Sequence, residues 1–127
     1  MDKKTKIFLS LVIVAIIAAG GIFLFTKTGK GPDKMEEFAK CLTEKKAVFY
    51  GAFWCSHCQN QKTMFGNSEK FLPYVECSTP DGKGQVSACQ EKQIQGYPTW
   101  EFQDGSRESG EVSLGALAEK TGCVLQK

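Results

Sequence analysis

The chain has no internal repeat, no low-complexity tract and, beyond its first 30 residues, no basic stripe. A length of 127 residues without repeats leaves room for one ordinary domain. The formal charge of +2 arises at the N-terminus, because residues 1–30 hold five lysines and one aspartate. The remaining residues are slightly acidic, which argues against binding of nucleic acids.

Residues 7–26 lack any charged side chain. As a helix that rises about 1.5 Å per residue, this apolar run would span about 30 Å, the thickness of the hydrocarbon core of a bilayer. Lysines precede the run within residues 1–6, which is typical of a leader that stays in the cytoplasm. The sequence therefore predicts a single-pass signal anchor in the cell membrane, with the rest of the chain on the extracytoplasmic side.

Two other interpretations of this run stay open. The small residues at 18–20 could form the cleavage site of a signal peptide, although the apolar run continues beyond them, and a buried core helix is the third choice. The run also lacks cysteine, which argues against lipoprotein processing. Residues 27–34 are polar, with two glycines and a proline, and predict a short linker to a domain over 35–127.

The pattern of that domain predicts alternating helices and strands. In chain order we expect a helix at 33–46, a strand at 47–53, a helix at 55–71, a strand at 74–77, a helix at 87–93, a β-hairpin at 98–110 and a helix at 113–121. A strand–helix–strand start followed by an antiparallel pair implies a mixed central sheet with helices on both faces. The predicted fold class is therefore α/β, a three-layer sandwich preceded by one transmembrane helix.

The stretch GAFWCSHCQN at 51–60 places two thiols three residues apart, where a strand gives way to a helix. Free backbone N–H groups and the positive end of the helix dipole favour an anion there, and the thiolate of Cys55 is the anion available. Such positions lower the pKa of a cysteine from about 8.5 to about 3.5–7.5. We therefore expect Cys55 to be an exposed nucleophile, and Cys58 to point inward and resolve the disulfide.

His57 is the only histidine in the chain and stands between these cysteines. Its ring would stabilise the Cys55 thiolate and make the disulfide a stronger oxidant, whereas the alternative is a polar side chain that faces solvent. Metal binding is the main rival chemistry, with Cys77 and Cys89 as further ligands, but their spacing does not form a zinc knuckle. We predict no metal, and no cofactor other than the redox-active pair itself.

Two motifs, WCSHC at 54–58 and YPT at 97–99, resemble those of the thioredoxin superfamily. The resemblance covers residues 35–123 and implies a thioredoxin-like fold, in which a cis peptide bond precedes Pro98 and this proline lies against the cysteine pair. It implies a catalytic set formed by Cys55, His57, Cys58 and Pro98. It also implies a substrate groove lined by Trp54, Ser56, Tyr97 and Thr99.

Within the superfamily, the chain most resembles the thioredoxin-like domain associated with bacterial vitamin K epoxide reductase homologues. This resemblance implies oxidation of dithiols in exported proteins, and re-oxidation of the pair by a separate quinone-linked membrane oxidase. Two positions depart from the pattern, since Ser56 stands where a proline is usual and Phe49 where thioredoxins bury an acid. Glu76 and Glu101 are the carboxylates that could reach the region.

The other four cysteines allow three pairings. Cys77 and Cys89 would bracket the glycine-rich loop 78–86, and Cys41 and Cys123 would tie the ends of the domain together, as expected in an oxidising compartment. Buried free thiols and a second redox relay through Cys77 and Cys89 are the alternatives.

The sequence as a whole predicts a thiol–disulfide oxidoreductase that acts on exported proteins with cysteines. Reduction or isomerisation by the same fold, a module that handles copper or zinc, and an adaptor that docks on a membrane partner are the rival functions.

Overall fold

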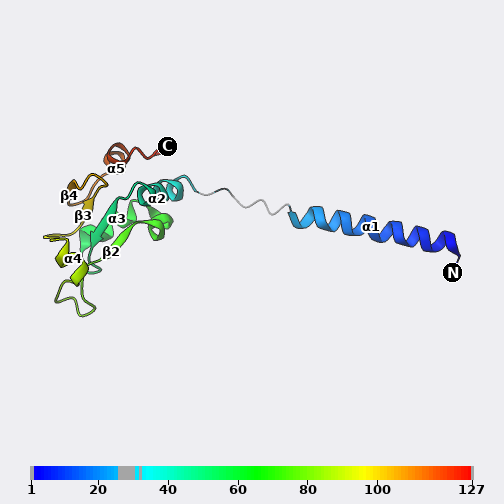
Figure 1. Cartoon of the computed structure of the whole chain (residues 1–127), viewed down its shortest axis with the longest axis horizontal. Coiled ribbons are helices and arrows are strands. Elements are labelled where there is room, and N and C mark those ends of the chain that lie inside the picture. The colour runs from blue at the N-terminus through cyan, green and yellow to red at the C-terminus, as the bar shows by residue number, and fades with distance from the viewer. Residues whose placement is uncertain (1, 26–30, 32, 127) are drawn as a thin grey trace. The chain divides into compact units, whose positions relative to one another are not determined.

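The computed structural model describes residues 2–25, 31 and 33–126. The chain divides into two compact units, Met1–Gly31 and Pro32–Lys127. In the first unit the described residues form the helix α1 (Lys3–Phe25), and the second unit holds a mixed α/β domain (Figure 1).

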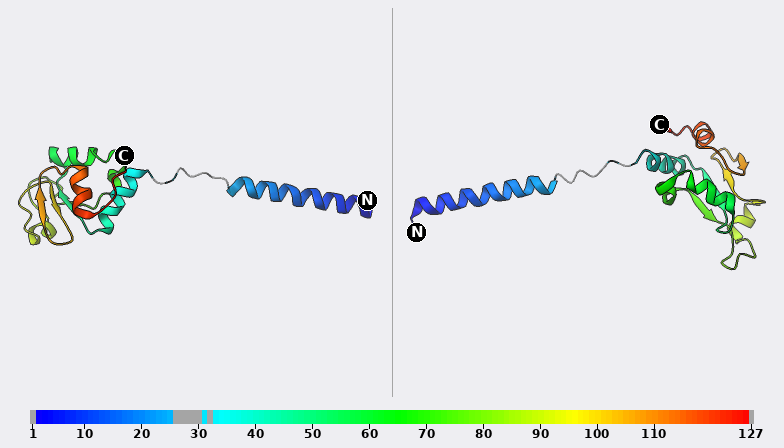
Figure 2. Two further views of the ribbon diagram at one scale, coloured as in Figure 1. Left: turned by 90° about the horizontal axis from the view of Figure 1, so that it is seen from above. Right: turned by 180° about the vertical axis from the view of Figure 1, so that it is seen from behind.

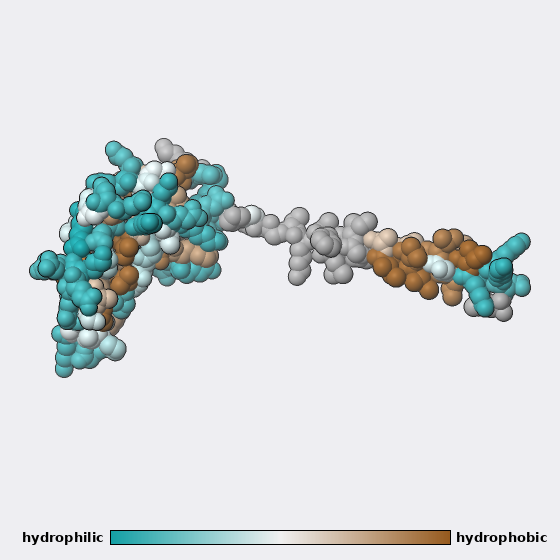
Figure 3. All heavy atoms as spheres, viewed as in Figure 1, coloured by the Kyte–Doolittle hydropathy of each residue, from teal (hydrophilic) through white to brown (hydrophobic). Residues whose placement is uncertain are grey.

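No helix in the described part of the chain is long and apolar enough to cross a membrane. The prediction of a transmembrane helix over 7–26 is therefore wrong. Figure 3 shows hydrophilic residues at the N-terminal end of α1, where its lysines lie, and hydrophobic residues after them. Residue 26 and most of the predicted linker, residues 27–30 and 32, lie outside the described residues.

Three helices, a 3-10 helix and four strands alternate through most of the domain, and a fourth helix closes it. They are α2 (Lys34–Glu44), β1 (Val48–Gly51), α3 (Ser56–Thr63), η1 (Gly66–Phe71), β2 (Tyr74–Glu76), α4 (Ser87–Glu91), β3 (Thr99–Glu101), β4 (Arg107–Ser109) and α5 (Leu114–Thr121). The strands form one sheet in the order β2-β1-β3-β4, in which β1 is parallel to β2 and the other two pairs are antiparallel. This is the mixed sheet that the sequence predicts.

Side chains of β1 alternate between two apolar clusters because neighbouring residues of a strand point to opposite faces. Phe49 belongs to the larger cluster, to which α2, α3 and α5 contribute, and stacks on Trp100 at 4.9 Å between ring centroids. Tyr50 belongs to the smaller cluster, together with Cys89 of α4. Helices therefore cover both faces of the sheet, as the two views of Figure 2 let the reader follow.

The helix expected at 55–71 is interrupted. α3 ends at Thr63, and the 3-10 helix η1 begins at Gly66, which has a φ of +53°. A left-handed residue cannot continue an α-helix, and glycine adopts this conformation at little cost. The strand expected at 47–53 is also shorter: β1 ends at Gly51, and Phe53 is exposed in the following turn.

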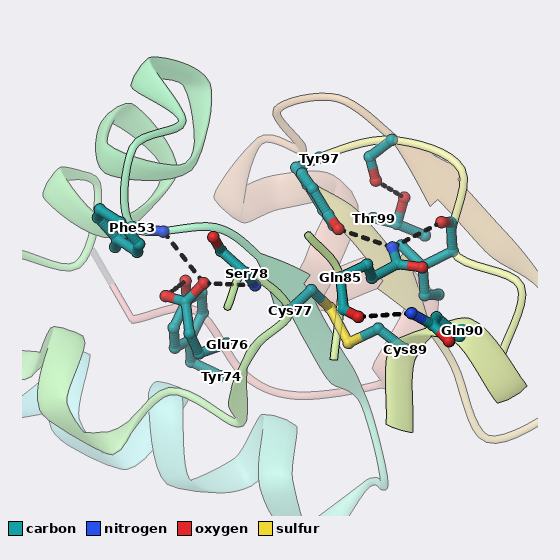
Figure 4. Close-up of a disulfide and its surroundings, with 12 residues drawn as sticks. Phe53, Tyr74, Glu76, Cys77, Ser78, Gln85, Cys89, Gln90, Tyr97 and Thr99 are labelled. Atoms are coloured by element: carbon teal, nitrogen blue, oxygen red, sulfur yellow. Dashed lines mark hydrogen bonds between the residues drawn. A yellow bond between two sulfur atoms is a disulfide. The ribbon is translucent and has the colours of Figure 1, made fainter. Parts of the chain in front are cut away.

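Two disulfides close the domain. One joins Cys41 of α2 to Cys123, which follows α5, and the other joins Cys77 to Cys89 of α4 (Figure 4). They link the same cysteines as the expected pairing. The loop inside the second ring is narrowed by an antiparallel bridge between Ser78 and Gln85.

Candidate active site

Cys55 is the residue at which α3 begins. The chain leaves β1 through a turn in which the Cys55 N–H donates to the carbonyl of Ala52 at 3.0 Å, and Cys55 itself keeps an extended backbone as the N-cap of α3. Its sulfur accepts a hydrogen bond from the N–H of Cys58 at 3.3 Å. The arrangement gives the Cys55 sulfur one of the unpaired amide donors of a helix N-terminus, which favours negative charge on that sulfur.

The burial of the two thiols differs from expectation. Cys55 was expected to be exposed, but it is only 7% exposed, since its thiol lies against the chain at Tyr97 and donates to that carbonyl at 3.6 Å. Cys58 is fully buried. Both are free cysteines. Cys55 therefore presents only a small part of its surface to solvent, and Cys58 presents none.

The Cys58 thiol strongly resists ionisation. Burial, with a contribution from its hydrogen bond to Cys55, raises the pKa of Cys58 to about 12. The N–H of Cys58 donates to the other sulfur of the pair. The surroundings of the two sulfurs therefore differ: burial disfavours ionisation of Cys58, and Cys55 is the sulfur to which the fold offers a donor.

The YPT motif lies across the cysteine pair. The Tyr97–Pro98 peptide bond is cis, and Pro98 is buried. The Tyr97 ring meets the ring of Trp54 edge-on, with centroids 5.9 Å apart, and Trp54 is 56% exposed. These two aromatic rings border the thiols.

The other two residues assigned to the groove are placed differently. Ser56 is exposed at the start of α3. Thr99 is buried, and its hydroxyl donates to the carbonyl of Gly96 at 2.8 Å. Thr99 therefore shapes the turn around Pro98, and the structure does not bring its side chain to the surface of a groove.

His57 is paired with a carboxylate that the sequence did not reveal. Its Nδ1 lies 2.7 Å from Oε1 of Glu111, and the same oxygen accepts from the side-chain amide of Asn60 at 3.1 Å. The hydrogen bond with His57, followed by that from Asn60, lowers the pKa of Glu111. No motif could have identified Glu111, because it lies 54 residues from His57. An effect of His57 on Cys55 stays a prediction.

A buried glutamine holds α3 in place. Gln61 lies one turn beyond Cys58 on the same buried face. Its Oε1 accepts from Trp100 Nε1 at 3.2 Å and from the N–H of Val112 at 2.7 Å, and its Nε2 donates to the Val112 carbonyl at 2.9 Å. The sequence analysis missed this residue, although its spacing of three from Cys58 was a signal that it faces inward.

The two carboxylates named as candidates for the region have different partners. Glu101 binds Lys92 at 3.1 Å and Arg107 Nε at 2.8 Å. Burial alone would raise the pKa of Glu101, but the hydrogen bonds and charges of these two partners hold this pKa below its ordinary value. Glu76 instead accepts a hydrogen bond from the Tyr74 hydroxyl at 2.7 Å. Only Glu76 belongs to the surroundings of the cysteine pair, since it also accepts from the N–H of Phe53 at 3.2 Å.

Among the side chains that the structure describes, no three or more histidine, cysteine or acidic residues are grouped so that they could hold a metal ion.

No protein-family model matches the chain. The chain is 50% identical over 94 residues, or 70% of its length, to a thiol-disulfide oxidoreductase named LTO1 from Arabidopsis thaliana. It spans only 24% of the length of that relative. The chain is therefore similar to a part of a protein named as a thiol-disulfide oxidoreductase.

Proposed function

We propose that this chain is a thiol–disulfide oxidoreductase in which Cys55 and Cys58 form the exchangeable pair. One observation carries the proposal: the Cys55 sulfur sits at the start of α3 and accepts the N–H of Cys58 at 3.3 Å, while the other four cysteines form disulfides. The similarity to a named thiol-disulfide oxidoreductase supports it.

The favoured direction is oxidation of a substrate dithiol. A substrate thiolate attacks the Cys55 sulfur of the disulfide, the Cys55–Cys58 bond breaks, and Cys58 takes up a proton. The second substrate thiolate then attacks the substrate sulfur that is bonded to Cys55, and the substrate disulfide forms. Cys55 leaves as a thiolate, which the N–H of Cys58 stabilises. Two electrons pass from the substrate to the pair, and no further cofactor is required. In this proposal His57, fixed by Glu111, favours the released Cys55 thiolate.

The substrates in this proposal are exported proteins with cysteines, in an oxidising compartment outside the cytoplasm. The two disulfides of the domain support such a compartment, because reducing ones keep thiols unpaired. A quinone-linked membrane oxidase of the vitamin K epoxide reductase type would return the pair to the disulfide. The resemblance of the stretches 50–66, 74–77 and 89–102 to domains associated with that enzyme supports this partner.

The test is covalent trapping with a Cys58→Ala variant of the full chain. Without the resolving sulfur, adducts through Cys55 should accumulate in cells and be released by dithiothreitol. A Cys55→Ala, Cys58→Ala double variant is the matched control and should trap nothing. Equal adducts from both variants, or none from either, would contradict the proposal.

The trapped proteins then separate the rival functions. A single membrane oxidase among them would support the proposed partner, and many exported clients would support direct oxidation. A pair found reduced in growing cells would indicate reduction or isomerisation. Zinc or copper that co-purifies with the wild type and is lost with Cys58 would indicate a metal-handling module.

A further inference from the structure

Gly51 lets the Tyr74 side chain approach the buried thiol. A Cβ atom at this position would lie 2.7 Å from Cε2 of Tyr74, 3.1 Å from the Cys58 sulfur and 3.4 Å from the Tyr74 hydroxyl oxygen, so that any larger residue would push these groups apart. The sulfur and the hydroxyl oxygen therefore lie on either side of one point, each within 3.4 Å of it. One hydrogen-bonded water molecule is enough to bridge two polar groups at such a separation.

The Tyr74 hydroxyl leads on to a carboxylate at the surface of the domain. It donates to Oε2 of Glu76 at 2.7 Å, and the other oxygen of Glu76 accepts from the N–H groups of Ser78 at 2.9 Å and Phe53 at 3.2 Å. Figure 4 shows Tyr74 and Glu76 side by side, with the Glu76 carboxylate directed at these two amides. Glu76 is only half-buried, so that it can exchange protons with solvent.

The charged groups around Tyr74 and Cys58 come from α3 and η1. Lys62 of α3 lies with Nζ 3.6 Å above the Tyr74 ring, and its charge favours ionisation of Cys58. Glu69 and Lys70 of η1 line, with Lys62 and Tyr74, a surface hollow of about 320 Å³. Cys55 also faces the thiol, since its sulfur accepts the N–H of Cys58.

The Tyr74 hydroxyl is suited to pass protons on while it stays uncharged itself. Burial, and then the hydrogen bond to Glu76, raise the pKa of Tyr74 well above its ordinary value. The phenol therefore stays neutral, and each proton that arrives from one side must leave on the other.

We propose that Tyr74 and Glu76 form the proton relay of Cys58, at the place where Gly51 lets the Tyr74 side chain approach the thiol. The proposal rests on the proposed function and deepens it. When a mixed disulfide at Cys55 is resolved, the Cys58 thiol proton passes to the Tyr74 oxygen while the Tyr74 hydroxyl proton passes to Glu76.

The electrons and atoms of that step balance. The Cys58 thiolate attacks the Cys55 sulfur, the bond from Cys55 to the substrate sulfur breaks, and the Cys55–Cys58 disulfide forms. The substrate sulfur leaves as a thiolate, and Glu76 gives its proton to solvent. When the enzyme oxidises a substrate, the same path runs in reverse and returns a proton to Cys58.

The test separates the two half-reactions of the reduced, full-length protein with oxidised glutathione. Acid-quenched samples analysed by mass spectrometry give the rate at which glutathione attaches to Cys55 and the rate at which Cys58 displaces it. Tyr74→Phe should leave attachment unchanged and slow displacement about 100-fold. In this variant the rate of displacement should rise about tenfold per pH unit, because only solvent hydroxide can take the proton from the Cys58 thiol. Glu76→Gln should show the same pH signature.

Tyr50→Phe is the matched control, because it removes a hydroxyl from the neighbouring strand in the other apolar cluster, beside Cys77 and Cys89. It should match the wild type in both rates. A Tyr74→Phe protein with wild-type displacement at every pH would overturn the relay and leave the oxidoreductase intact. Equal slowing of both half-reactions, or equal slowing in Tyr50→Phe, would also overturn it. A wild type that never exchanges with glutathione would overturn the proposed function, and the relay with it.

Discussion

At the scale of single residues, the two thiols of the pair differ in what surrounds them. Cys55 lies at the edge of the buried region and receives an amide donor, whereas Cys58 is enclosed and faces Tyr74 across the position of Gly51. Enclosure penalises a charged sulfur, and a nearby donor favours one. In the proposed function, this difference suits Cys55 to the role of attacking sulfur and Cys58 to that of resolving sulfur, although the two residues are of the same type.

The raised pKa of Cys58 predicts a loss of stability in alkali when only the Cys55–Cys58 pair is reduced. The unfolded thiol ionises near 9.0 but the folded one only near 12, so the contribution of Cys58 to stability is complete below 9.0 and is lost as the pH rises through this window. Urea unfolding, measured below and above pH 9.0, should show that the free energy of unfolding falls more steeply with pH in the wild type than in Cys58→Ala. Parallel curves for the two proteins would contradict the prediction.

Residues of the site could be predicted where the chemistry is local. Cys55 and Cys58 stand in one short motif, and the cis bond before Pro98 followed from a resemblance that is itself local. Glu111 was missed because its partner His57 lies 54 residues away, and a lone glutamate carries no pattern. Tyr74 was missed because it meets Cys58 only where β1, β2 and α3 come together at Gly51. The exposure of Cys55 was misjudged because the chain at Tyr97, 42 residues away, covers it.

At the scale of elements, the site depends on how firmly α3 is held. Its sequence has no continuous apolar face, and its buried side chains are Cys58 and Gln61. Gln61 makes hydrogen bonds to β3 and to the segment before α5, and thus fixes the helix that carries both cysteines.

Gln61→Leu should therefore destabilise the domain by about 2–4 kcal/mol, because it leaves buried groups of Trp100 and Val112 without partners, each costing about 1–3 kcal/mol. Urea unfolding followed by fluorescence would measure the loss. Gln103→Leu, in an exposed turn, is the control and should change stability by less than about 0.5 kcal/mol. Equal losses in the two variants would show that the buried amide does not anchor α3.

Helices with clear capping residues at their ends were predicted well, and the failures have local causes. The closing helix begins at Ser113, whose hydroxyl accepts from the N–H of Ala116, and ends at Gly122 with a φ of +74°. Asp33 occupies the equivalent position before α2 but makes no such hydrogen bond. The helix over 55–71 was predicted too long, since the left-handed conformation of Gly66 is a property of the fold rather than of the glycine alone.

At the scale of the whole molecule, two covalent rings of different size close the domain. The bond between Cys41 and Cys123 spans 82 residues of sequence, and that between Cys77 and Cys89 spans 12. In the chain-entropy model a larger ring restricts the unfolded chain more.

Replacing Cys41 and Cys123 together by serine should lower the free energy of unfolding by about 4.5 kcal/mol, and replacing Cys77 and Cys89 together by about 3 kcal/mol. Urea unfolding of the two double variants, with the wild type as reference, shows which variant loses more free energy of unfolding. The reverse order would mean that contacts around the rings, rather than ring size, set the loss.

The α/β arrangement of the domain could be predicted from sequence because its strands are short and bounded by turns. The membrane helix was predicted from a count of uncharged residues alone, and the structure overturned that prediction. The single histidine illustrates the same limit, because its partner became visible only once α3 and the segment before α5 were folded together.

The outer strands of the sheet have a consequence for a protein that is proposed to meet unfolded chains. β2 and β4 are its two edges, each only three residues long and carrying charged side chains such as Glu76, Arg107 and Glu108. Short, charged edges offer little template for another polypeptide to pair with. A half-folded client can therefore be held by its sulfur without being recruited into the sheet as an additional strand, and the protein avoids seeding an aggregate of its own substrates.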